Sequence, residues 1–275
     1  MLSDKEISFL MEIKKITSRN NEYIKELAKL GDRKKRSESG KFAFEGKKLL
    51  SEAISFGAPI EAVLMTEKAI SDFKGDLSAL SVIEVSNEVY EKISFEKSPE
   101  GIFCVSKVLD KLHNLYIIYK GSFFGERIFL LDGIRDPGNL GTMLRTAFAF
   151  GCDTVVMSAD CADVYNSKTV RASMGAVFKQ KTVRVSDMAG TVSALKDNGY
   201  TVLCAALDDS AVSLTDVKID EKTCFVVGNE GAGIRKEIID ASNGTVIIPM
   251  ENGTESLNAA SAATVLMWEQ YRQRK

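Results

Sequence analysis

The stretch RIFLLDGIRDPGNLGTMLRTAFAFG, residues 127–151, decides the fold class of the second half of the chain. It begins with an unbroken apolar run, which is typical of a strand buried on both faces of a parallel sheet. A loop rich in Gly, Asp, Pro and Asn follows, and the segment 139–150 then has the apolar spacing of a helix. The stretch therefore predicts a strand–loop–helix unit in which Arg145 is the one charge of an otherwise apolar helix.

The same alternation of strand and helix continues to the end of the chain. The predicted strands are 127–134, 153–159, 181–186, 200–207, 223–230 and 244–250, and the predicted helices are 139–150, 166–178, 187–198, 233–242 and 256–273. Alternating strands and helices require crossover connections and a sheet covered on both faces. We therefore expect residues 127–275 to form an α/β domain around a parallel sheet.

The first hundred residues predict a smaller α/β domain, residues 1–106. The first 30 residues have the spacing of a helix, and segment 87–94 predicts another helix, capped by Asn87. The other elements expected in this domain are a helix over 47–57 and strands over 41–46, 61–65, 81–86 and 101–109. Residues 107–126 mix aromatics with glycines and are interpreted as a linker.

The composition narrows the possible functions. The chain has 275 residues, a formal net charge of −2 and a hydrophobic fraction of 45%, which is the balance of a soluble globular protein. Its single histidine, His113, has no ligand-spaced partner, so we expect no metal site and no Ser-His-Asp triad. No signal peptide or membrane span is evident and the cysteines form no CxxC pair, which predicts a cytoplasmic protein.

Three strands are followed by unusual loops, and ligand sites in open α/β sheets lie beyond the carboxyl ends of strands. The loops are DGIRDPGNLGTMLR at 132–145, VVGNEGAGI at 226–234 and IIPMENGTESLNAASAA at 247–263. The glycines of the second loop are spaced G-x-x-G-x-G, which is not the dinucleotide-binding order, so a nicotinamide enzyme is disfavoured. Tight-turn glycines would not need Glu230 at the tip of that loop, and Ser256 in the third loop could be no more than a helix N-cap.

Together, the three loops resemble the motifs of the SpoU (TrmH-type) RNA 2'-O-ribose methyltransferases of the SPOUT superfamily. The resemblance rests on Asn139 and Arg145, on GNEG at 228–231, and on IPM at 248–250 leading to SLN at 256–258. It covers about 127–273 and includes NSKTVRASMGAVF at 166–178. In the first domain, F-x-x-EG at 42–46 and SPEGIFCV at 98–105 resemble the substrate-binding extension of this family.

The resemblance implies a domain with a deep trefoil knot, a homodimer, and S-adenosylmethionine as the cofactor. It assigns the cofactor to backbone groups of Gly228, Ile248, Met250 and Leu257, and the chemistry to Arg145, Asn139, Glu230, Ser256 and Asn258. In the family the arginine activates the ribose 2'-hydroxyl, either by transient deprotonation or by stabilising the developing alkoxide as a cation. No metal is implied, because the sulfonium carbon is already electrophilic and positioning is the main demand.

The resemblance also favours RNA as the partner, with rRNA ahead of tRNA because of the N-terminal extension. The candidate RNA contacts are the basic run Arg33, Lys34, Lys35 and Arg36, with Lys168 and Arg171 as secondary candidates. From charge alone, a solvated surface turn is the favoured interpretation of the basic run. The alternatives are a tRNA 2'-O-methyltransferase and a non-catalytic RNA-binding protein on the same fold, and binding of S-adenosylmethionine would separate the last from an enzyme.

Overall fold

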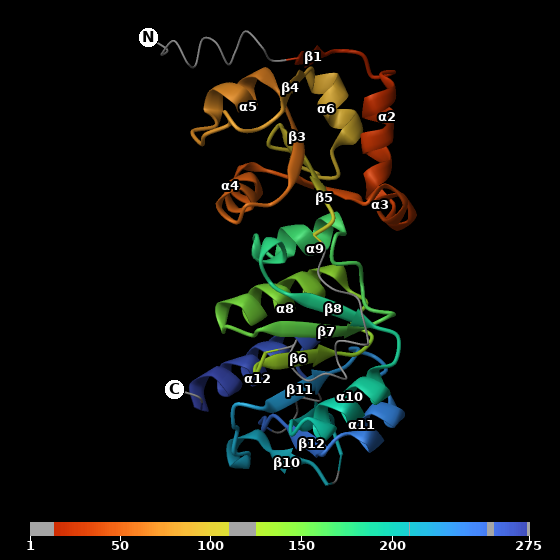
Figure 1. Ribbon diagram of the computed structural model, residues 1–275, viewed down its shortest axis with the longest axis vertical. Helices are drawn as coiled ribbons and strands as arrows, with labels where there is room; N and C mark the ends of the chain where they lie inside the picture. Colours follow the sequence, from red (N-terminus) through yellow and green to blue (C-terminus); the bar gives the residue numbers. More distant parts are fainter. Residues whose placement is uncertain (1–13, 110–124, 209, 252–255, 274–275) are drawn as a thin grey trace. The chain divides into compact units, whose positions relative to one another are not determined.

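The computed structural model describes residues 14–109, 125–208, 210–251 and 256–273, and the chain forms two compact units (Figure 1). The first unit comprises Met1–Leu109 together with Tyr165–Phe178, and the second comprises Asp110–Val164 together with Lys179–Lys275. The predicted second domain, 127–275, therefore includes one segment, Tyr165–Phe178, that packs with the first unit. Most of the predicted linker 107–126, with His113, lies outside the described residues.

The first unit is built on a mixed five-stranded sheet in the order β1-β4-β3-β5-β2. β5 is antiparallel to β2 and β3, and the other pairs are parallel. The elements are β1 Lys14–Ile16, α2 Glu22–Ala28, a 3-10 helix Lys29–Gly31, α3 Arg33–Ser39, β2 Lys41–Glu45, α4 Lys47–Ser55, β3 Ile60–Met65, α5 Glu67–Asp72, β4 Val82–Val85, α6 Asn87–Ile93 and β5 Ile102–Lys107.

Two predictions for this unit were wrong in detail. A continuous helix over the first 30 residues is excluded, because Lys14–Ile16 pairs with β4 as an edge strand. Asn21 then starts α2, since its side chain accepts hydrogen bonds from the backbone N–H groups of Tyr23 and Ile24. The cap of α6 is Ser86 rather than Asn87, because it is the Ser86 hydroxyl that accepts from the backbone of Val89.

The segment Tyr165–Phe178 contacts the sheet of the first unit through aromatic rings. Tyr165 lies 4.6 Å from Phe42 between ring centroids, and Phe178 lies 5.0 Å from Phe44. The segment forms α9 Ser167–Ala172 and a 3-10 helix Ala176–Phe178. Between them Gly175 has φ of 95° and approaches α4, so a Cβ there would lie 2.7 Å from the Glu52 side chain. These contacts explain why this segment is part of the first unit.

The second unit contains a seven-stranded sheet, parallel throughout, in the order β10-β12-β9-β11-β6-β7-β8. This confirms the expected α/β class. The strands are β6 Ile128–Leu131, β7 Thr154–Ser158, β8 Thr182–Val185, β9 Thr201–Ala205, β10 Val212–Ser213, β11 Thr223–Val227 and β12 Gly244–Ile247. All six predicted strands appear within their predicted ranges, and the short edge strand β10 was not predicted.

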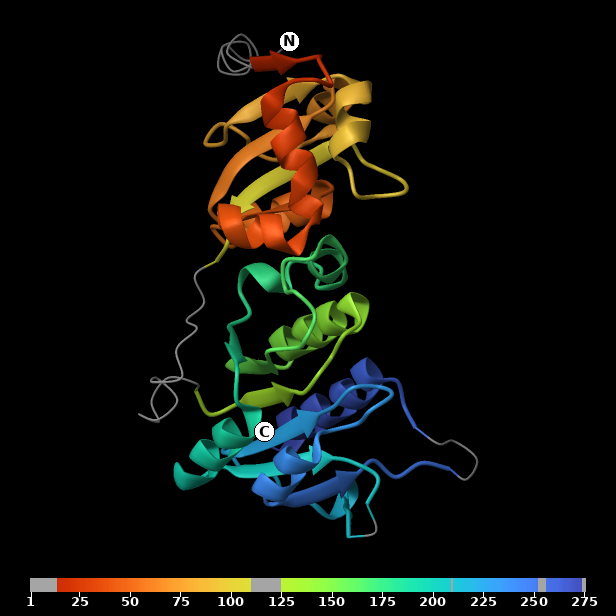
Figure 2. The same ribbon diagram turned by 90° about the vertical axis from the view of Figure 1, so that its right-hand side faces the viewer.

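Helices cover both faces of this sheet (Figure 2). The helices are α8 Pro137–Ala149, α10 Met188–Asp197, α11 Lys236–Ala241 and α12 Ala259–Gln273, with a 3-10 helix at Leu214–Asp216. α8 packs on α12, and α10 packs on α11. Ile128 and Leu130 of β6 join the core under α10 and α11, so the alternation of side chains along β6 turns Phe129 and Leu131 to the opposite face.

Candidate active site

The candidate site lies where the order of the parallel sheet reverses. β6 and β11 are neighbours, but the chain leaves β6 toward β7 on one side and leaves β11 toward β12 on the other. Such a switch point opens a crevice outside the carboxyl ends of the two strands. The loops 132–136 and 228–235 meet there, and the Asn229 side chain donates to the backbone oxygen of Gly133 at 3.0 Å.

Three of the five predicted catalytic residues come together at this edge. Asn139 donates through Nδ2 to Glu230 Oε1, and its Oδ1 accepts from Asn258 Nδ2 at 3.3 Å. The three side chains come from three separate segments, the first turn of α8, the loop after β11 and the residue before α12, up to 119 residues apart along the chain. We call Asn139, Glu230 and Asn258 the amide–carboxylate cluster.

Local sequence places each member of the amide–carboxylate cluster. Asp136 caps α8 by accepting from the backbone N–H of Asn139 at 2.7 Å, and Pro137 occupies the first helical turn, where no donor is required. Asn258 caps α12, because its Oδ1 accepts from the backbone of Ala260 at 2.9 Å. The interpretation of Ser256 as this cap was therefore wrong. Asn258 caps the helix through its oxygen and contacts Asn139 through its nitrogen.

Glu230 stands at the tip of a closed turn. Asn229 and Gly233 exchange backbone hydrogen bonds of 3.1 and 2.9 Å, and Asn229 Oδ1 accepts from the backbone of Gly231 at 2.9 Å. Gly233 has φ of 69°, and a Cβ on Gly228 would lie 2.4 Å from the Gly233 backbone. Backbone geometry thus requires glycine at 228 and 233, and Asn229 organises the turn. Asn229 was not among the predicted site residues, although it belongs to the GNEG motif.

Arg145 lies on the exposed face of α8, together with Thr142 and Phe148. The helix is therefore buried on one side only, through Leu140, Met143, Leu144 and Ala147, and the guanidinium is not a buried charge. Among the described residues, Arg145 forms no ion pair and does not contact the amide–carboxylate cluster. A charge in this position is available to a ligand or to another protein chain.

The remaining predicted cofactor residues lie at the same edge of the sheet. Ile248 and Met250 follow the carboxyl end of β12 and are half-buried, while Ser256 and Leu257 are exposed just before α12. Half-buried apolar side chains suit the faces of an adenine ring, and backbone groups outside the strand pairing can form hydrogen bonds with its edge. The Glu230 carboxylate suits a cationic group of the ligand. The residues present therefore fit S-adenosylmethionine, with Gly228, Ile248, Met250 and Leu257 as the groups that would hold it.

Comparisons with known proteins identify the family. The model of the SpoU rRNA methylase family matches residues 126–268, and the MRM3-like substrate-binding domain matches residues 21–104. The chain is 30% identical over 258 residues to the 23S rRNA (guanosine(2553)-2'-O)-methyltransferase RlmP of Bacillus subtilis, covering 93% of this chain and 98% of that protein. The chain belongs to the SpoU rRNA methylase family.

Two further relatives cover nearly the whole chain. The 23S rRNA (uridine(2479)-2'-O)-methyltransferase of Streptomyces viridochromogenes is 30% identical over 273 residues, covering 95% of this chain and 93% of that protein. The AdoMet-bound rRNA methyltransferase of Sinorhizobium meliloti superposes with a TM-score of 0.80 at 26% identity, covering 94% of this chain and 98% of that chain. The relatives match both units of this SpoU family member.

The predicted RNA contacts all belong to the first unit. Arg33, Lys34 and Lys35 are exposed on α3, where both lysines face Glu38 within 4.0 Å. Arg36 is 4% exposed and donates to the backbone oxygens of Leu30 and Gly31, both at 2.8 Å. Arg36 thus satisfies carbonyls at the end of the preceding helix, and its burial argues against the predicted contact with RNA.

The two secondary candidates lie on α9. Lys168 is exposed, and the exposed guanidinium of Arg171 is ion-paired with Glu96. Because α9 packs with the first unit, both residues are grouped with that unit rather than with the amide–carboxylate cluster.

The described residues contain no cluster of His, Cys, Asp and Glu side chains that could hold a metal ion. Within the same part of the chain, none of the helices combines the length and the apolar character that crossing a bilayer requires.

Proposed function

We propose that this protein transfers a methyl group from S-adenosylmethionine to a ribose 2'-hydroxyl of RNA, with 23S rRNA as the substrate. The observation that supports this most directly is the amide–carboxylate cluster at the β6–β11 switch point, because it assembles residues of all three family motifs. The substrate choice rests on the match of the first unit to a substrate-binding domain and on two relatives that methylate 23S rRNA. We also propose the family's trefoil knot for the second unit.

In this proposal each group has a distinct task. S-adenosylmethionine supplies a methyl group on a positively charged sulfur. Glu230 and Asn139 orient the bound reactants, and Arg145 donates hydrogen bonds to the 2'-oxygen as negative charge develops there. The new carbon–oxygen bond would replace the carbon–sulfur bond, leaving a neutral thioether, and the hydroxyl proton would pass to solvent water. Arg33, Lys34 and Lys35 contact RNA phosphates, which fits their exposure on α3.

The position of Arg145 supports a homodimer in which the partner copy completes the site. Arg145 does not contact the amide–carboxylate cluster of its own chain, although the reaction requires both. Phe148, on the same exposed face of α8, is 39% exposed, and Trp268 of α12 is 47% exposed. Trp268 packs against Phe150 at 5.6 Å. An exposed aromatic patch beside Arg145 is suited to burial between two copies of this chain.

The five cysteines are buried and form no disulfide among the residues that the structure describes, which suits the reducing cytoplasm where we place the reaction.

The decisive experiment is transfer of a labelled methyl group to total rRNA and total tRNA from a strain that lacks this protein. We expect alkali-resistant label in 23S rRNA and its loss in Arg145→Ala and Asn139→Ala. Lys218→Ala, which removes an exposed cation from the loop before β11 at the opposite edge of the sheet, serves as the control with wild-type activity.

The other outcomes are equally informative. Label confined to tRNA would keep the reaction and overturn the choice of substrate. Absence of label together with absence of S-adenosylmethionine binding would overturn the enzyme and leave an RNA-binding protein. For the dimer, Trp268→Lys should yield a monomer in analytical ultracentrifugation with little activity, and a variant that stays dimeric would contradict the proposed interface.

A further inference from the structure

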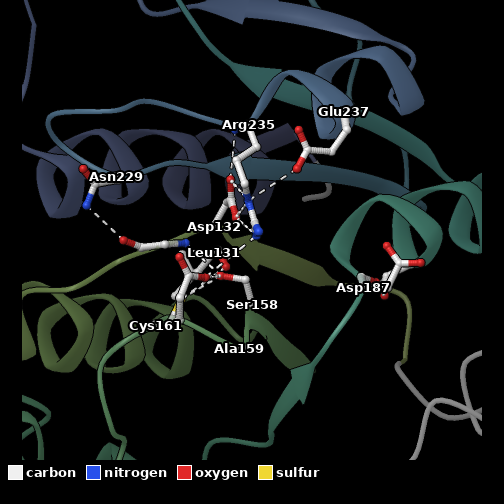
Figure 3. A network of polar contacts seen from close by, with 12 residues as sticks. Leu131, Asp132, Ser158, Ala159, Cys161, Asp187, Asn229, Arg235 and Glu237 are labelled. Carbon is white, nitrogen blue, oxygen red and sulfur yellow. Dashed lines mark hydrogen bonds and ion pairs between the residues drawn. The ribbon is translucent and has the colours of Figure 1, made fainter.

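An ion pair between the buried Asp132 carboxylate and the half-exposed Arg235 guanidinium lies beyond the carboxyl ends of β6 and β11 (Figure 3). Asp132 is the first residue after β6, and its side chain is 2% exposed. Its carboxylate accepts from the Arg235 backbone N–H at 3.0 Å, from Arg235 Nε at 2.9 and 3.2 Å, and from Arg235 Nη2. The Asp132 hydrogen bond raises the pKa of Arg235. This is the fork geometry that arginine, unlike lysine, can provide.

Asp132 contacts both ends of the loop that carries Glu230. At the entry, the Asp132 backbone N–H donates to the oxygen of Val227, the last residue of β11, at 2.9 Å. At the exit, the Asp132 carboxylate holds Arg235, which precedes α11. Between these points the Asn229 side chain donates to the oxygen of Gly133. The loop from β11 to α11 is therefore attached to residues 132–133 at its beginning, within its turn and at its end.

A third strand supports the same arrangement. The Gly133 backbone N–H donates to the Ser158 hydroxyl at 2.8 Å, and that hydroxyl donates to Asp160 at 2.6 Å. Asp160 in turn lies 3.8 Å from the Arg235 guanidinium. Figure 3 shows these groups converging from the ends of β6, β7 and β11. Residues 132–133 are thus held from the side of β7 as well.

These contacts matter because the loop from β11 to α11 could otherwise adopt many backbone conformations. It contains Gly228, Gly231 and Gly233, and glycine loses more conformational freedom on ordering than any other residue. The closed turn 229–233 can shift only if its attachments at Asp132 and Gly133 change. Such a shift would move Glu230 away from Asn139, which follows Asp132 along the same loop into α8.

We propose that Asp132 and Arg235 are positioning residues, which set the place of Glu230 against Asn139 through the glycine turn. Asn229 is their third contact point. This inference rests on the proposed methyl transfer, because Glu230 is taken as part of its site. It assigns a role in the reaction to a pair that does not itself contact the reactants.

The test compares Arg235→Lys, Glu230→Ala and the double variant in methyl transfer to RNA. Arg235→Lys retains the charge beside the buried carboxylate but cannot form the fork. We expect its kcat to fall about tenfold or more, with KM for RNA changed less than about threefold, because small misplacements of reacting groups are costly. In the Glu230→Ala background, Arg235→Lys should cause no further loss, since both changes act through one group.

Arg272→Lys is the matched control, because Arg272 makes a comparable two-point contact with Glu269 at the end of α12. It should retain wild-type kcat. Wild-type kcat in Arg235→Lys, or additive losses in the double variant, would overturn the proposal. Should Arg235→Lys fail to fold, Asn229→Ala leaves the charge pair intact and should show the same dependence on Glu230.

Hydrogen exchange gives a readout that does not require activity. Amides of residues 229–235 should exchange at least about tenfold faster in Arg235→Lys while those of β11 are unchanged. Inactive wild-type protein would overturn the proposed function, and the exchange data would then still decide whether the pair orders the turn. Unchanged exchange at 229–235 would overturn the positioning role itself.

Discussion

At the scale of single residues, Asn258 combines a helix-capping contact with a contact to another residue of the proposed site. Its Oδ1 caps α12 through the backbone of Ala260 and Ser261, and its Nδ2 donates to Asn139. The two contacts use opposite ends of one amide group. A substitution that keeps the oxygen and removes the nitrogen can therefore separate stability from activity.

Asn258→Asp should keep the stability of the wild type and lose activity. Aspartate caps a helix as well as asparagine does and favours the positive N-terminus, but it cannot donate to Asn139. Asn258→Ala should lose activity and also about 1 kcal/mol of stability. Urea unfolding and initial rates of methyl transfer measure the two effects, and equal activity in Asn258→Asp and the wild type would contradict the role of the Nδ2 contact.

Gly228 provides a second residue-scale prediction. A Cβ there would lie 2.4 Å from Gly233 C and 2.5 Å from Ile234 N, both backbone atoms that cannot move without opening the turn. Gly228→Ala should cost about 1–3 kcal/mol in the free energy of unfolding.

Gly231→Ala is the control for this prediction, because its nearest neighbour would be the Asn229 side chain at 3.6 Å, an ordinary contact. Its stability should lie within about 0.5 kcal/mol of the wild type. Equal losses in the two alanine variants by urea unfolding would show that the close backbone approach is not what requires glycine at 228.

At the scale of elements, one carboxylate joins β2 to α6 in the first unit. Glu45, the last residue of β2, accepts from the hydroxyls of Tyr90 and Ser94, both at 2.7 Å, and from the backbone of Phe95 at 2.6 Å. Tyr90 also donates to the oxygen of Ile102 in β5. The F-x-x-EG segment thus contains a structural glutamate that anchors the end of α6.

These contacts make the stability contributed by Tyr90 depend on pH. Burial, and then the charge of Glu45, raise the pKa of the Tyr90 hydroxyl well above its usual value of 10. The folded protein retains this proton where the unfolded chain releases it. The contribution is therefore fully present below about pH 10 and is lost as the pH rises beyond it.

Tyr90→Phe supplies the measurement. The difference in unfolding free energy between wild type and Tyr90→Phe should be constant from pH 7 to about pH 9 and shrink above about pH 10. Urea unfolding across this range records it. A difference that grows with pH would mean that the folded state favours the ionised tyrosine, contrary to its burial beside Glu45.

At the scale of the whole molecule, the first unit is completed by a distant segment of the chain. Tyr165–Phe178 lies between β7 and β8 in sequence but packs with the first unit, where Phe178 contacts Phe44. Phe44 is 1% exposed and Phe178 is 6% exposed. The stability of the first sheet should therefore depend on residues that belong to the second half of the sequence.

Phe178→Ala should destabilise the first unit although it lies outside residues 1–109. Removing a buried phenylalanine costs about 3–5 kcal/mol, so amide exchange in β2 should accelerate while exchange in β11 stays the same. Met174→Ala is the control, because Met174 is 42% exposed in the same segment. Equal protection of β2 in Phe178→Ala and the wild type would contradict the assignment of this segment.

Most of the helices and strands of this protein, and all of its motifs, can be deduced from the amino-acid sequence alone. Buried parallel strands such as Ile128–Leu131 and Thr223–Val227 need apolar residues on both faces, so their positions are visible as unbroken runs. The residues of the amide–carboxylate cluster could be named because their motifs resemble those of a known family. The edge strand Lys14–Ile16 was mistaken for helix, because a strand with one buried residue leaves little periodic signal.

Which of these segments contact one another becomes visible only in the folded chain. The order of the strands brings Asp132 against Arg235, which is 103 residues distant, and no local pattern records such a pairing. Packing also decided that Arg36 is buried while its neighbours on α3 are exposed, and that Tyr165–Phe178 completes the first unit. The spacing of apolar residues along the sequence indicates whether a side chain is buried. The residue that this side chain contacts depends on the path of the whole chain.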